Sequence, residues 1–493
     1  MGIVQNQASR VTIVSFLGVF IGALNTLFFF PYILGAERHG LVILILSIAT
    51  IFSQFAHFGV PNTIIRFSPF LREQNKFIYR LAIQIPLMSV VFFSLLFFLF
   101  GDWFFESYID NNTLFDQYKY SLSPLVISLV FFEVMLSISR SKLKTVFPSI
   151  LRELFLRLMT FVCLCLFYIG WLDFSSFILT WILIHLINVV ILTFHLIKSS
   201  NFKFEFGFPL FPNKLIAKKM QIYGLVTLLT SSAAILVNRI DIIMLGHFMK
   251  LENIAFYSVA FFMATLIHIP ARSILQIVKP ILAKSWAGQD ILEISSLYKK
   301  SALIQMFFGM LLFIGIWMNL EDFLVYVPEK YRGIEWVFFY LGLAKLIDVS
   351  SGVNGAILAT SEKYLFDLYI NVFLIIVTVI TNIIFIPLYG INGAAIATTI
   401  SIFIHNIIKL TVVYHFFKIH PFQLSSVKLL FIGLLTFFVL HQISFDFISL
   451  IWFKILIRSI VISSIYILPV IYLNISDDLN EILQRNHSFK ARS

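Results

Sequence analysis

Long apolar stretches alternate along this chain with short connectors whose charge changes sign from one connector to the next. A helix needs about 20 apolar residues to cross a bilayer. Of the 493 residues, 59% are hydrophobic and only 12% are charged, which places nearly the whole chain in membrane. We predict an all-α integral membrane protein with about fourteen transmembrane helices, over residues 11–34, 41–63, 81–100, 121–139, 154–171, 176–197, 221–246, 254–277, 301–318, 336–359, 364–386, 392–415, 427–443 and 451–473.

The distribution of Lys and Arg predicts the orientation of these helices. Basic residues cluster around 66–80, 140–157, 198–219 and 272–300, and the connectors between these clusters are poor in Lys and Arg and mostly acidic. Basic connectors stay in the cytoplasm, so both termini are predicted to be cytoplasmic. The net charge of +11 is then explained by topology and inner-leaflet headgroups rather than by nucleic-acid binding.

The connectors are too short to hold a folded soluble domain. We expect two six-helix bundles related by a pseudo-axis, residues 1–219 and 220–420, followed by two extra transmembrane helices and a cytoplasmic tail in 421–493. A faint pattern recurs in the two predicted bundles, in which a histidine and a proline precede an arginine: His57, Pro61 and Arg66, and His268, Pro270 and Arg272. Prolines inside spans, such as Pro270, predict kinked helices.

Several functional classes lack their motifs. The sequence has no GxxxxGK[ST] phosphate loop, no HExxH and no DxD pair. Cys163 and Cys165 are the only cysteines, and their spacing places them on different faces of one apolar helix, so neither a disulfide nor a metal site is predicted. We therefore expect no cofactor, no metal and no enzyme, and a transport activity driven by an ion gradient or by the gradient of the substrate.

The seventh predicted span carries two charges, Arg239 and Asp241. Because they are two residues apart, they lie about 200° apart around the helix and cannot face each other. One interpretation is an interhelical ion pair or an arginine that snorkels outward. The other is a cationic lining for an anionic substrate, because charged residues inside a membrane are functional candidates by default.

Three more charged residues lie in the middle of spans: Glu133, Lys345 and Asp348. Lys345 and Asp348 are three residues apart and share a helix face, so they are expected to neutralise each other. Glu133 is then the acid predicted to lack a partner. We treat Glu133, Asp241, Lys345 and Asp348 as candidates for ion coupling, because burial favours the protonated form of a carboxylate.

One stretch combines a tight Pro/Gly turn with small residues that allow close helix packing: Ile386-Pro387-Leu388-Tyr389-Gly390-Ile391-Asn392-Gly393-Ala394-Ala395-Ile396-Ala397-Thr398. This stretch resembles the most recognisable segment of the bacterial polysaccharide repeat-unit flippases of O-antigen type, in the multidrug/oligosaccharidyl-lipid/polysaccharide (MOP) exporter superfamily. Four further segments are similar to that family, namely 34–40, 59–61, 238–241 and 255–260, although Ala255 stands where the family usually has glycine.

The resemblance implies a V-shaped pair of bundles that opens alternately to each side of the bacterial inner membrane. It implies a substrate, an undecaprenyl-diphosphate-linked oligosaccharide that is flipped outward for surface polysaccharide synthesis. The partners it implies are this lipid-linked substrate, membrane lipids, a polysaccharide polymerase and glycosyltransferases. The cationic positions that match the family's cavity lining are Arg10, Arg66, Arg239 and Arg272.

Three alternatives stay open at this point. The first is a multidrug or lipid II exporter of the same superfamily, although the two extra C-terminal spans argue against the usual twelve-helix drug antiporter. The second is a membrane glycosyltransferase or polysaccharide polymerase, which needs a sizeable outer loop with arginines, whereas residues 101–120 contain none. The third is a structural scaffold.

Overall fold

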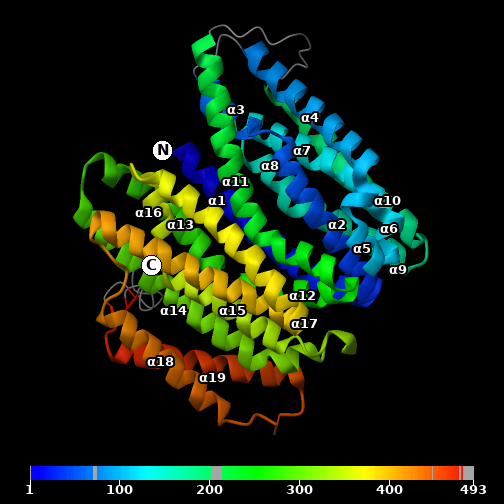
Figure 1. Cartoon of the computed structure of the whole chain (residues 1–493). Coiled ribbons are helices and arrows are strands. Elements are labelled where there is room, and N and C mark those ends of the chain that lie inside the picture. Colours follow the sequence, from blue (N-terminus) through cyan, green and yellow to red (C-terminus); the bar gives the residue numbers. More distant parts are fainter. Residues whose placement is uncertain (1, 70–74, 201–213, 447, 477–478, 481–493) are drawn as a thin grey trace. The chain divides into compact units, whose positions relative to one another are not determined.

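The computed structural model describes all residues except 1, 70–74, 201–213, 447, 477–478 and 481–493. The described residues form helices and no strand. Figure 1 shows these helices, most of them labelled, in the following order: α1 (Gly2–Leu24), η1 (Asn25–Leu34), α2 (Gly35–Ala56), α3 (Val60–Phe67), α4 (Asn75–Phe104), α5 (Glu106–Asn111), α6 (Thr113–Tyr118), η3 (Lys119–Ser121), α7 (Leu122–Ser141), α8 (Val146–Ile150), η4 (Leu151–Phe155), α9 (Leu156–Tyr168), α10 (Phe174–Ser200), α11 (Lys214–Phe248), α12 (Leu251–Leu266), α13 (Ile269–Ala287), α14 (Ile291–Leu324), η5 (Glu329–Tyr331), α15 (Glu335–Ser350), α16 (Asn354–Thr360), α17 (Tyr364–Phe417), α18 (Leu424–His441) and α19 (Ile451–Tyr472).

The helices confirm a multi-span membrane protein. Among the described residues, eight helical segments are long and apolar enough to cross a bilayer, or eleven if each of three bent helix pairs is one span. Two of the eight, Arg10–Ala56 with 47 residues and Tyr364–Phe417 with 54, are longer than one crossing requires. Each of them covers two predicted spans, and the count of about fourteen stays a prediction.

The predicted Pro/Gly turn lies inside α17. Gly390 has φ 60° and ψ −133°, which interrupts the helix there. The two halves of α17 approach closely after this turn, because a Cβ atom at Gly393 would lie only 1.9 Å from the carbonyl oxygen of Phe385. Only glycine fits at that position, as the small-residue pattern predicts.

Several helices are broken rather than straight. The expected kink at Pro270 is confirmed, because α12 and α13 meet at an angle of 49° around His268. α15 and α16 meet at 50°, and the connecting residues include Gly352 in the left-handed region at φ 69°. The break between α2 and α3 contains Phe58 and Gly59, both with positive φ.

The chain packs as two compact units, Met1–Ser258 and Val259–Ser493. α11 belongs to the first unit, because it packs against α2, α3 and α5. The predicted division into two six-helix bundles, 1–219 and 220–420, with two extra helices and a tail in 421–493, stays a prediction.

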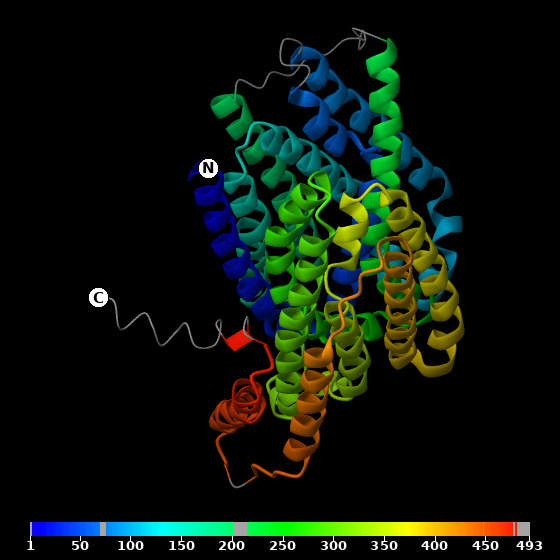
Figure 2. The ribbon, with the colours of Figure 1, turned by 90° about the vertical axis from the view of Figure 1, so that its left-hand side faces the viewer.

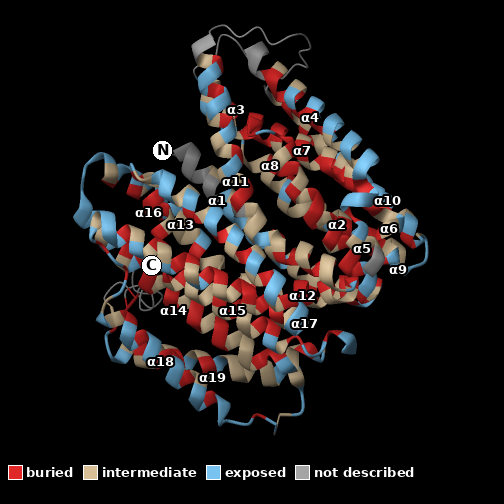
Figure 3. Ribbon diagram, in the orientation of Figure 1, coloured by how far each residue is buried: buried red, intermediate tan, exposed pale blue. Residues whose placement is uncertain are grey.

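In the first unit, α7 is the central helix and contacts α2, α3, α4 and α10. Its Val134 and Ile138 are fully buried, in one cluster with Ala82 of α4 and Leu192 of α10. In the second unit, α14, α15 and α17 pack against one another, and Figure 3 shows buried residues along their facing sides.

The hairpin of α18 and α19, orange and red in Figures 1 and 2, packs against α14 of the second unit. Its apolar contact includes Phe307 and Met310 of α14, Leu429 of α18 and Tyr466 of α19. The Tyr466 hydroxyl donates a hydrogen bond of 3.2 Å to the carbonyl oxygen of Phe307. The two extra helices are therefore an integral part of the second unit.

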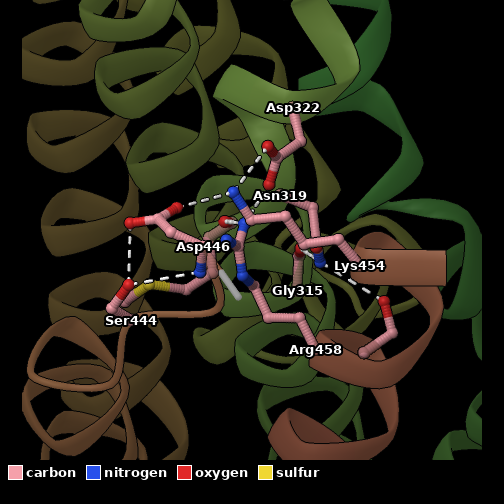
Figure 4. Close-up of polar contacts among 9 residues, drawn as sticks. Gly315, Asn319, Asp322, Ser444, Asp446, Lys454 and Arg458 are labelled. Carbon is pink, nitrogen blue, oxygen red and sulfur yellow. Dashed lines mark hydrogen bonds and ion pairs between the residues drawn. The ribbon is translucent and has the colours of Figure 1, made fainter. Parts of the chain in front are cut away.

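A group of four charges holds α19 to one end of α14 (Figure 4). We call Asp322, Asp446, Lys454 and Arg458 the C-terminal clamp. The Asp322 carboxylate receives Arg458 Nη1 at 2.5 Å and Lys454 Nζ at 3.1 Å. Lys454 also lies 3.0 Å from Asp446, and Arg458 donates to the Met318 carbonyl oxygen. No sequence pattern indicates the clamp, because Asp322 is more than 100 residues from its other three members.

Candidate functional site

The four arginines predicted to line a cavity lie on four helices. Arg10 of α1, Arg66 of α3 and Arg239 of α11 belong to the first unit, and Arg272 of α13 belongs to the second. Arg10, Arg66 and Arg272 are exposed, and Arg239 is half-buried. The lining of one cavity by all four stays a prediction.

The two charges of α11 point to different neighbours. Arg239 donates a long hydrogen bond of 3.4 Å from Nη1 to Ser47 Oγ of α2. Asp241, with 3% of its surface exposed, accepts a 2.7 Å hydrogen bond from the Tyr257 hydroxyl of α12. This arrangement agrees with the expectation that side chains two residues apart on a helix face opposite ways.

α2 and the break after it lie very close to α11 and to the start of α12. A Cβ atom at Gly40 of α2 would lie 1.9 Å from the carbonyl oxygen of Leu251, the first residue of α12, and one at Gly59 would lie 2.1 Å from that of Gly224 in α11. Such distances require backbone to pack directly on backbone, which only glycine allows. Arg239 is therefore carried by a helix that is tightly seated on α2.

Asn112, between α5 and α6, fixes the turn that connects α11 with α12. Its Oδ1 accepts a 2.8 Å hydrogen bond from the Leu251 backbone N–H, and its Nδ2 donates to the Met249 carbonyl oxygen at 3.3 Å. One buried amide thus satisfies a donor and an acceptor of the turn.

Arg66 lies near the end of α3 with its guanidinium over an aromatic ring. Its Cζ is 4.4 Å from the centroid of the Tyr223 ring of α11, a cation–π geometry. Within the described part of the chain, neither Arg66 nor Arg239 forms an ion pair with a carboxylate. Both guanidinium groups therefore keep donors that a bound anion can accept.

The expectation that Glu133 has no partner was wrong. Its carboxylate forms an ion pair of 2.9 Å with Arg152 of η4, and both side chains are partly exposed. Arg140, two turns further along α7, is close enough for both charges to act on it. The sequence analysis placed Arg152 in a connector, whereas the π-helical turn η4 continues into α9 and turns this arginine toward α7.

A further arginine of the first unit was missed as a candidate. Arg157 of α9 packs its guanidinium against Gly22 of α1, where a Cβ atom would lie 3.0 Å from Nη1. Its carboxylate partner is Glu153 at 3.1 Å, and its carbonyl oxygen accepts a 2.9 Å hydrogen bond from Asn25. The GxxxG spacing of Gly18 and Gly22 is the signal that could have indicated this close helix contact.

In the second unit, Asp348 of α15 is surrounded by polar side chains from the break between α12 and α13, from α16 and from α17. His268 Nε2, between α12 and α13, lies 3.1 Å from Asp348 Oδ2. Asn406 of α17 donates from Nδ2 to Asp348 Oδ1 at 3.1 Å, and Asn354 of α16 donates to Asn406 Oδ1 at 3.1 Å. The charge of Lys345 also acts on Asp348, and the Lys345 Nζ lies 5.4 Å from the Phe261 ring centroid.

A second half-buried acid lies on α17 itself. Asp367 forms an ion pair of 2.9 Å with Lys409 and accepts a 3.2 Å hydrogen bond from Asn371 Nδ2. Asn371 Oδ1 in turn lies 3.2 Å from His405 Nε2. Sequence analysis assigned no role to His405 or Asp367, because their partners are brought together only when the two halves of α17 fold back at Gly390.

The two units thus offer different chemistry inside the membrane. The first presents guanidinium groups that can bind an anion, and the second contains carboxylates that already receive N–H donors. The described residues contain no group of three or more His, Cys, Asp or Glu side chains that could hold a metal ion.

No known protein-family model matches the sequence, and no curated protein sequence matches it. Solved structures do match over most of the chain. The lipid II flippase MurJ in an inward closed conformation is similar with a TM-score of 0.75 and 15% identity, covering 97% of this chain and 99% of that one.

Two further MOP superfamily transporter structures are similar as well. An inward-facing multidrug resistance MATE family transporter of the MOP superfamily has a TM-score of 0.67 and 14% identity, and covers 84% of this chain and 98% of its own. A MOP superfamily transporter from Pyrococcus furiosus, described by the reverse polarity of its binding pocket, has a TM-score of 0.54 and 14% identity, covering 84% and 96%. These likenesses establish the fold: the chain has the fold of MOP superfamily transporters.

Proposed function

We propose that this protein is a flippase that moves an undecaprenyl-diphosphate-linked oligosaccharide from the cytoplasmic to the outer leaflet by alternating access, coupled to an ion gradient. The observation that carries the proposal is the pair Arg66 and Arg239, two arginines on membrane helices that form no ion pair with a carboxylate of the described chain. Burying charge in a membrane is costly, so such residues mark substrate paths.

Arginine suits this substrate chemically. A guanidinium group offers N–H donors in a planar fork that matches two phosphate oxygens, and a charge-assisted hydrogen bond is about twice as strong as a neutral one. The diphosphate and sugars would pass between polar side chains, while the polyprenyl tail stays in lipid. Under this proposal Arg10 and Arg272 contribute to the same cationic lining.

A multidrug exporter is the second candidate, and coverage of the chain distinguishes the two. The MATE structure aligns with 84% of this chain and the lipid II flippase with 97%. The difference is comparable in length to the α18–α19 hairpin and its tail. Because that hairpin is packed and clamped onto α14, we favour a lipid-linked saccharide over a soluble drug.

We also propose where in the cell the protein lies and how it is oriented. The protein would lie in the bacterial inner membrane with both termini in the cytoplasm, beside the polymerase and glycosyltransferases that use or make the same lipid-linked saccharide. The basic connectors support this orientation.

The test is complementation of a bacterial strain that lacks its own flippase. Arg66→Ala and Arg239→Ala should each lower surface polysaccharide roughly 10–100-fold and cause lipid-linked saccharide to accumulate on the cytoplasmic side, because a charged hydrogen bond is worth about 1.5–3 kcal/mol. The matched control is Arg332→Ala, an arginine in the η5 connector that pairs with Glu329. Normal polysaccharide with both cavity variants would refute the assignment.

A further inference from the structure

A pocket of about 320 Å³ lies in the first unit, lined by residues of α3, α4 and α11 and of the break before α3. α3 contacts both α4 and α11, and one of its faces lines the pocket through Val60, Thr63, Ile64 and Phe67. Among the described residues that line it, Thr63 and Gln221 carry the only polar side chains. The pocket is therefore suited to an apolar group rather than to a sugar or a metal ion.

The floor of this pocket is buried, and its rim is exposed. Val60 and Ile64 lie on the floor, whereas Phe58, Ile85 of α4 and Leu225 of α11 are exposed large apolar side chains. An apolar rim on membrane helices lets an apolar chain enter from the bilayer without removing polar groups from water. The pocket is thus accessible to the chain of a lipid.

The break between α2 and α3 fixes part of the rim. Phe58 has φ 49°, in the left-handed region that bulky residues rarely adopt. His57 holds the next residue in place, because its Nδ1 accepts a 3.2 Å hydrogen bond from the Gly59 N–H. Gly59 also packs directly on the backbone of Gly224. The pocket is therefore preformed, which lowers the entropy cost of binding.

One end of the pocket is cationic. Arg66 is adjacent to Phe67 in α3, and both side chains lie against Tyr223 of α11. Arg66 Cζ is 4.4 Å from the Tyr223 ring centroid, and the Phe67 ring centroid is 5.8 Å from it. Lys218 and Lys219, both exposed, directly precede the lining residues of α11. Arg66 forms no ion pair with a carboxylate of the described chain, so its charge is available to a ligand.

An apolar pocket with a cationic end fits an amphiphile in which an anionic group is joined to an apolar chain. A guanidinium group binds phosphate oxygens through its planar fork, and burial of the chain in the pocket is favourable. At the ~30 Å³ that one water molecule occupies, the pocket holds roughly ten groups of that size, which is the first part of a long chain. A cationic drug would be repelled by the same arginine.

We infer that this pocket is the loading site for the polyprenyl diphosphate part of the substrate. Arg66 binds the diphosphate, the first isoprene units occupy the pocket, and the rest of the tail stays in lipid. The site lies next to the basic connector 66–80, on the side proposed to be cytoplasmic, so it binds the substrate before it is flipped. The identity of the substrate rests on the proposed function, whereas the pocket and its cationic end do not.

Photolabelling of the full-length protein in phosphatidylethanolamine nanodiscs tests the site. The probe is undecaprenyl diphosphate with a diazirine on its first isoprene unit, and it should label peptides of α3, α4 and α11. Arg66→Ala should lower the labelling at least roughly tenfold, because charge-assisted hydrogen bonds are lost. Ile85→Trp should abolish the labelling by filling the pocket. Leu229→Trp is the matched control, because Leu229 is exposed on α11 one turn beyond the lining.

Two results of the labelling would overturn the inference. One is labelling confined to other helices, and the other is equal labelling of Ile85→Trp and Leu229→Trp. Competition then identifies the source of the phosphate, because a bilayer phospholipid carries the same chemistry. An excess of phosphatidylglycerol should leave the labelling unchanged. Displacement of the probe by phosphatidylglycerol would assign the pocket to a bilayer lipid and would also overturn the inference.

Flipping of lipid-linked saccharide in proteoliposomes separates this inference from the proposed function. Ile85→Trp should flip the saccharide more slowly than Leu229→Trp, because the loading site is filled. If the native protein flips the saccharide while the probe does not label the pocket, the inference fails and the proposed function stands. If the probe labels the pocket while the native protein flips no saccharide, the proposed function fails and the binding site stands.

Discussion

The polar interiors of the two units differ in which charge is left available. In the first unit, Arg66 and Arg239 contact a ring and a hydroxyl but form no ion pair with a carboxylate of the described chain. In the second unit, Asp322, Asp348 and Asp367 each receive at least two donors. The first unit is thus suited to bind an anion that is not part of the protein. In the second unit, these three carboxylates are neutralised by side chains of the same unit. Substitutions should therefore affect stability mainly in the second unit and substrate handling mainly in the first.

The largest expected effect comes from removing an acid of the second unit. Asp322→Ala leaves Lys454 and Arg458 buried without their shared partner, and breaking a buried ion pair costs roughly 3–5 kcal/mol. We expect a loss of this size in the free energy of unfolding in detergent. Asp446→Ala is the control, because 82% of that side chain is exposed and exposed ion pairs contribute little to stability. Equal losses in the two variants would contradict a stabilising role for the C-terminal clamp.

Backbone packing should come next and should be similar in both units. Gly40→Ala and Gly393→Ala each place a Cβ atom 1.9 Å from a carbonyl oxygen, and overpacking of this kind costs about 1–3 kcal/mol. Gly315→Ala is the matched control in α14, because nothing lies within 4 Å of its Cβ position. Thermal unfolding of the three variants measures the difference, and unaltered stability of Gly40→Ala would contradict the close contact between α2 and the start of α12.

Substitution of the arginines of the first unit should affect substrate transport more than the stability of the fold. Arg239→Ala should change the free energy of unfolding by less than about 1 kcal/mol, because it breaks one long hydrogen bond and no ion pair. Arg239→Lys should retain part of the flipping activity, since it keeps the charge but loses the planar fork. A large loss of stability in Arg239→Ala would mean that this arginine is structural.

The smallest effect should be a pH dependence at the edge of the C-terminal clamp. The Ser444 hydroxyl and then Lys454 lower the pKa of Asp446, which lies in the loop before α19. A lowered pKa in the folded state contributes stability above the unfolded pKa of about 4, and that contribution is lost as the pH falls below it. The unfolding midpoint of the native protein should therefore fall slightly more than that of Asp446→Asn on acidification, and a larger fall in the variant would reverse the sign.

Local features of the fold could be predicted from the sequence, whereas long-range pairing could not. The apolar stretches, the kink at Pro270 and the turn at Gly390 depend on a few neighbouring residues, and the structure contains all three. The partner of Glu133 depends on which face η4 turns toward α7. The donors around Asp348 come from three separate parts of the chain, so spacing along the sequence carries no information about them.

The contrast between an anion-binding first unit and a self-neutralised second unit is tested most directly by substrate binding. The measurement is the affinity of the purified protein for an undecaprenyl-diphosphate-linked oligosaccharide, for the native chain and for the double variant Arg66→Ala/Arg239→Ala. We predict binding that is weaker by at least roughly tenfold, because each charged hydrogen bond contributes about 1.5–3 kcal/mol. Unchanged affinity in a double variant of native stability would contradict the account.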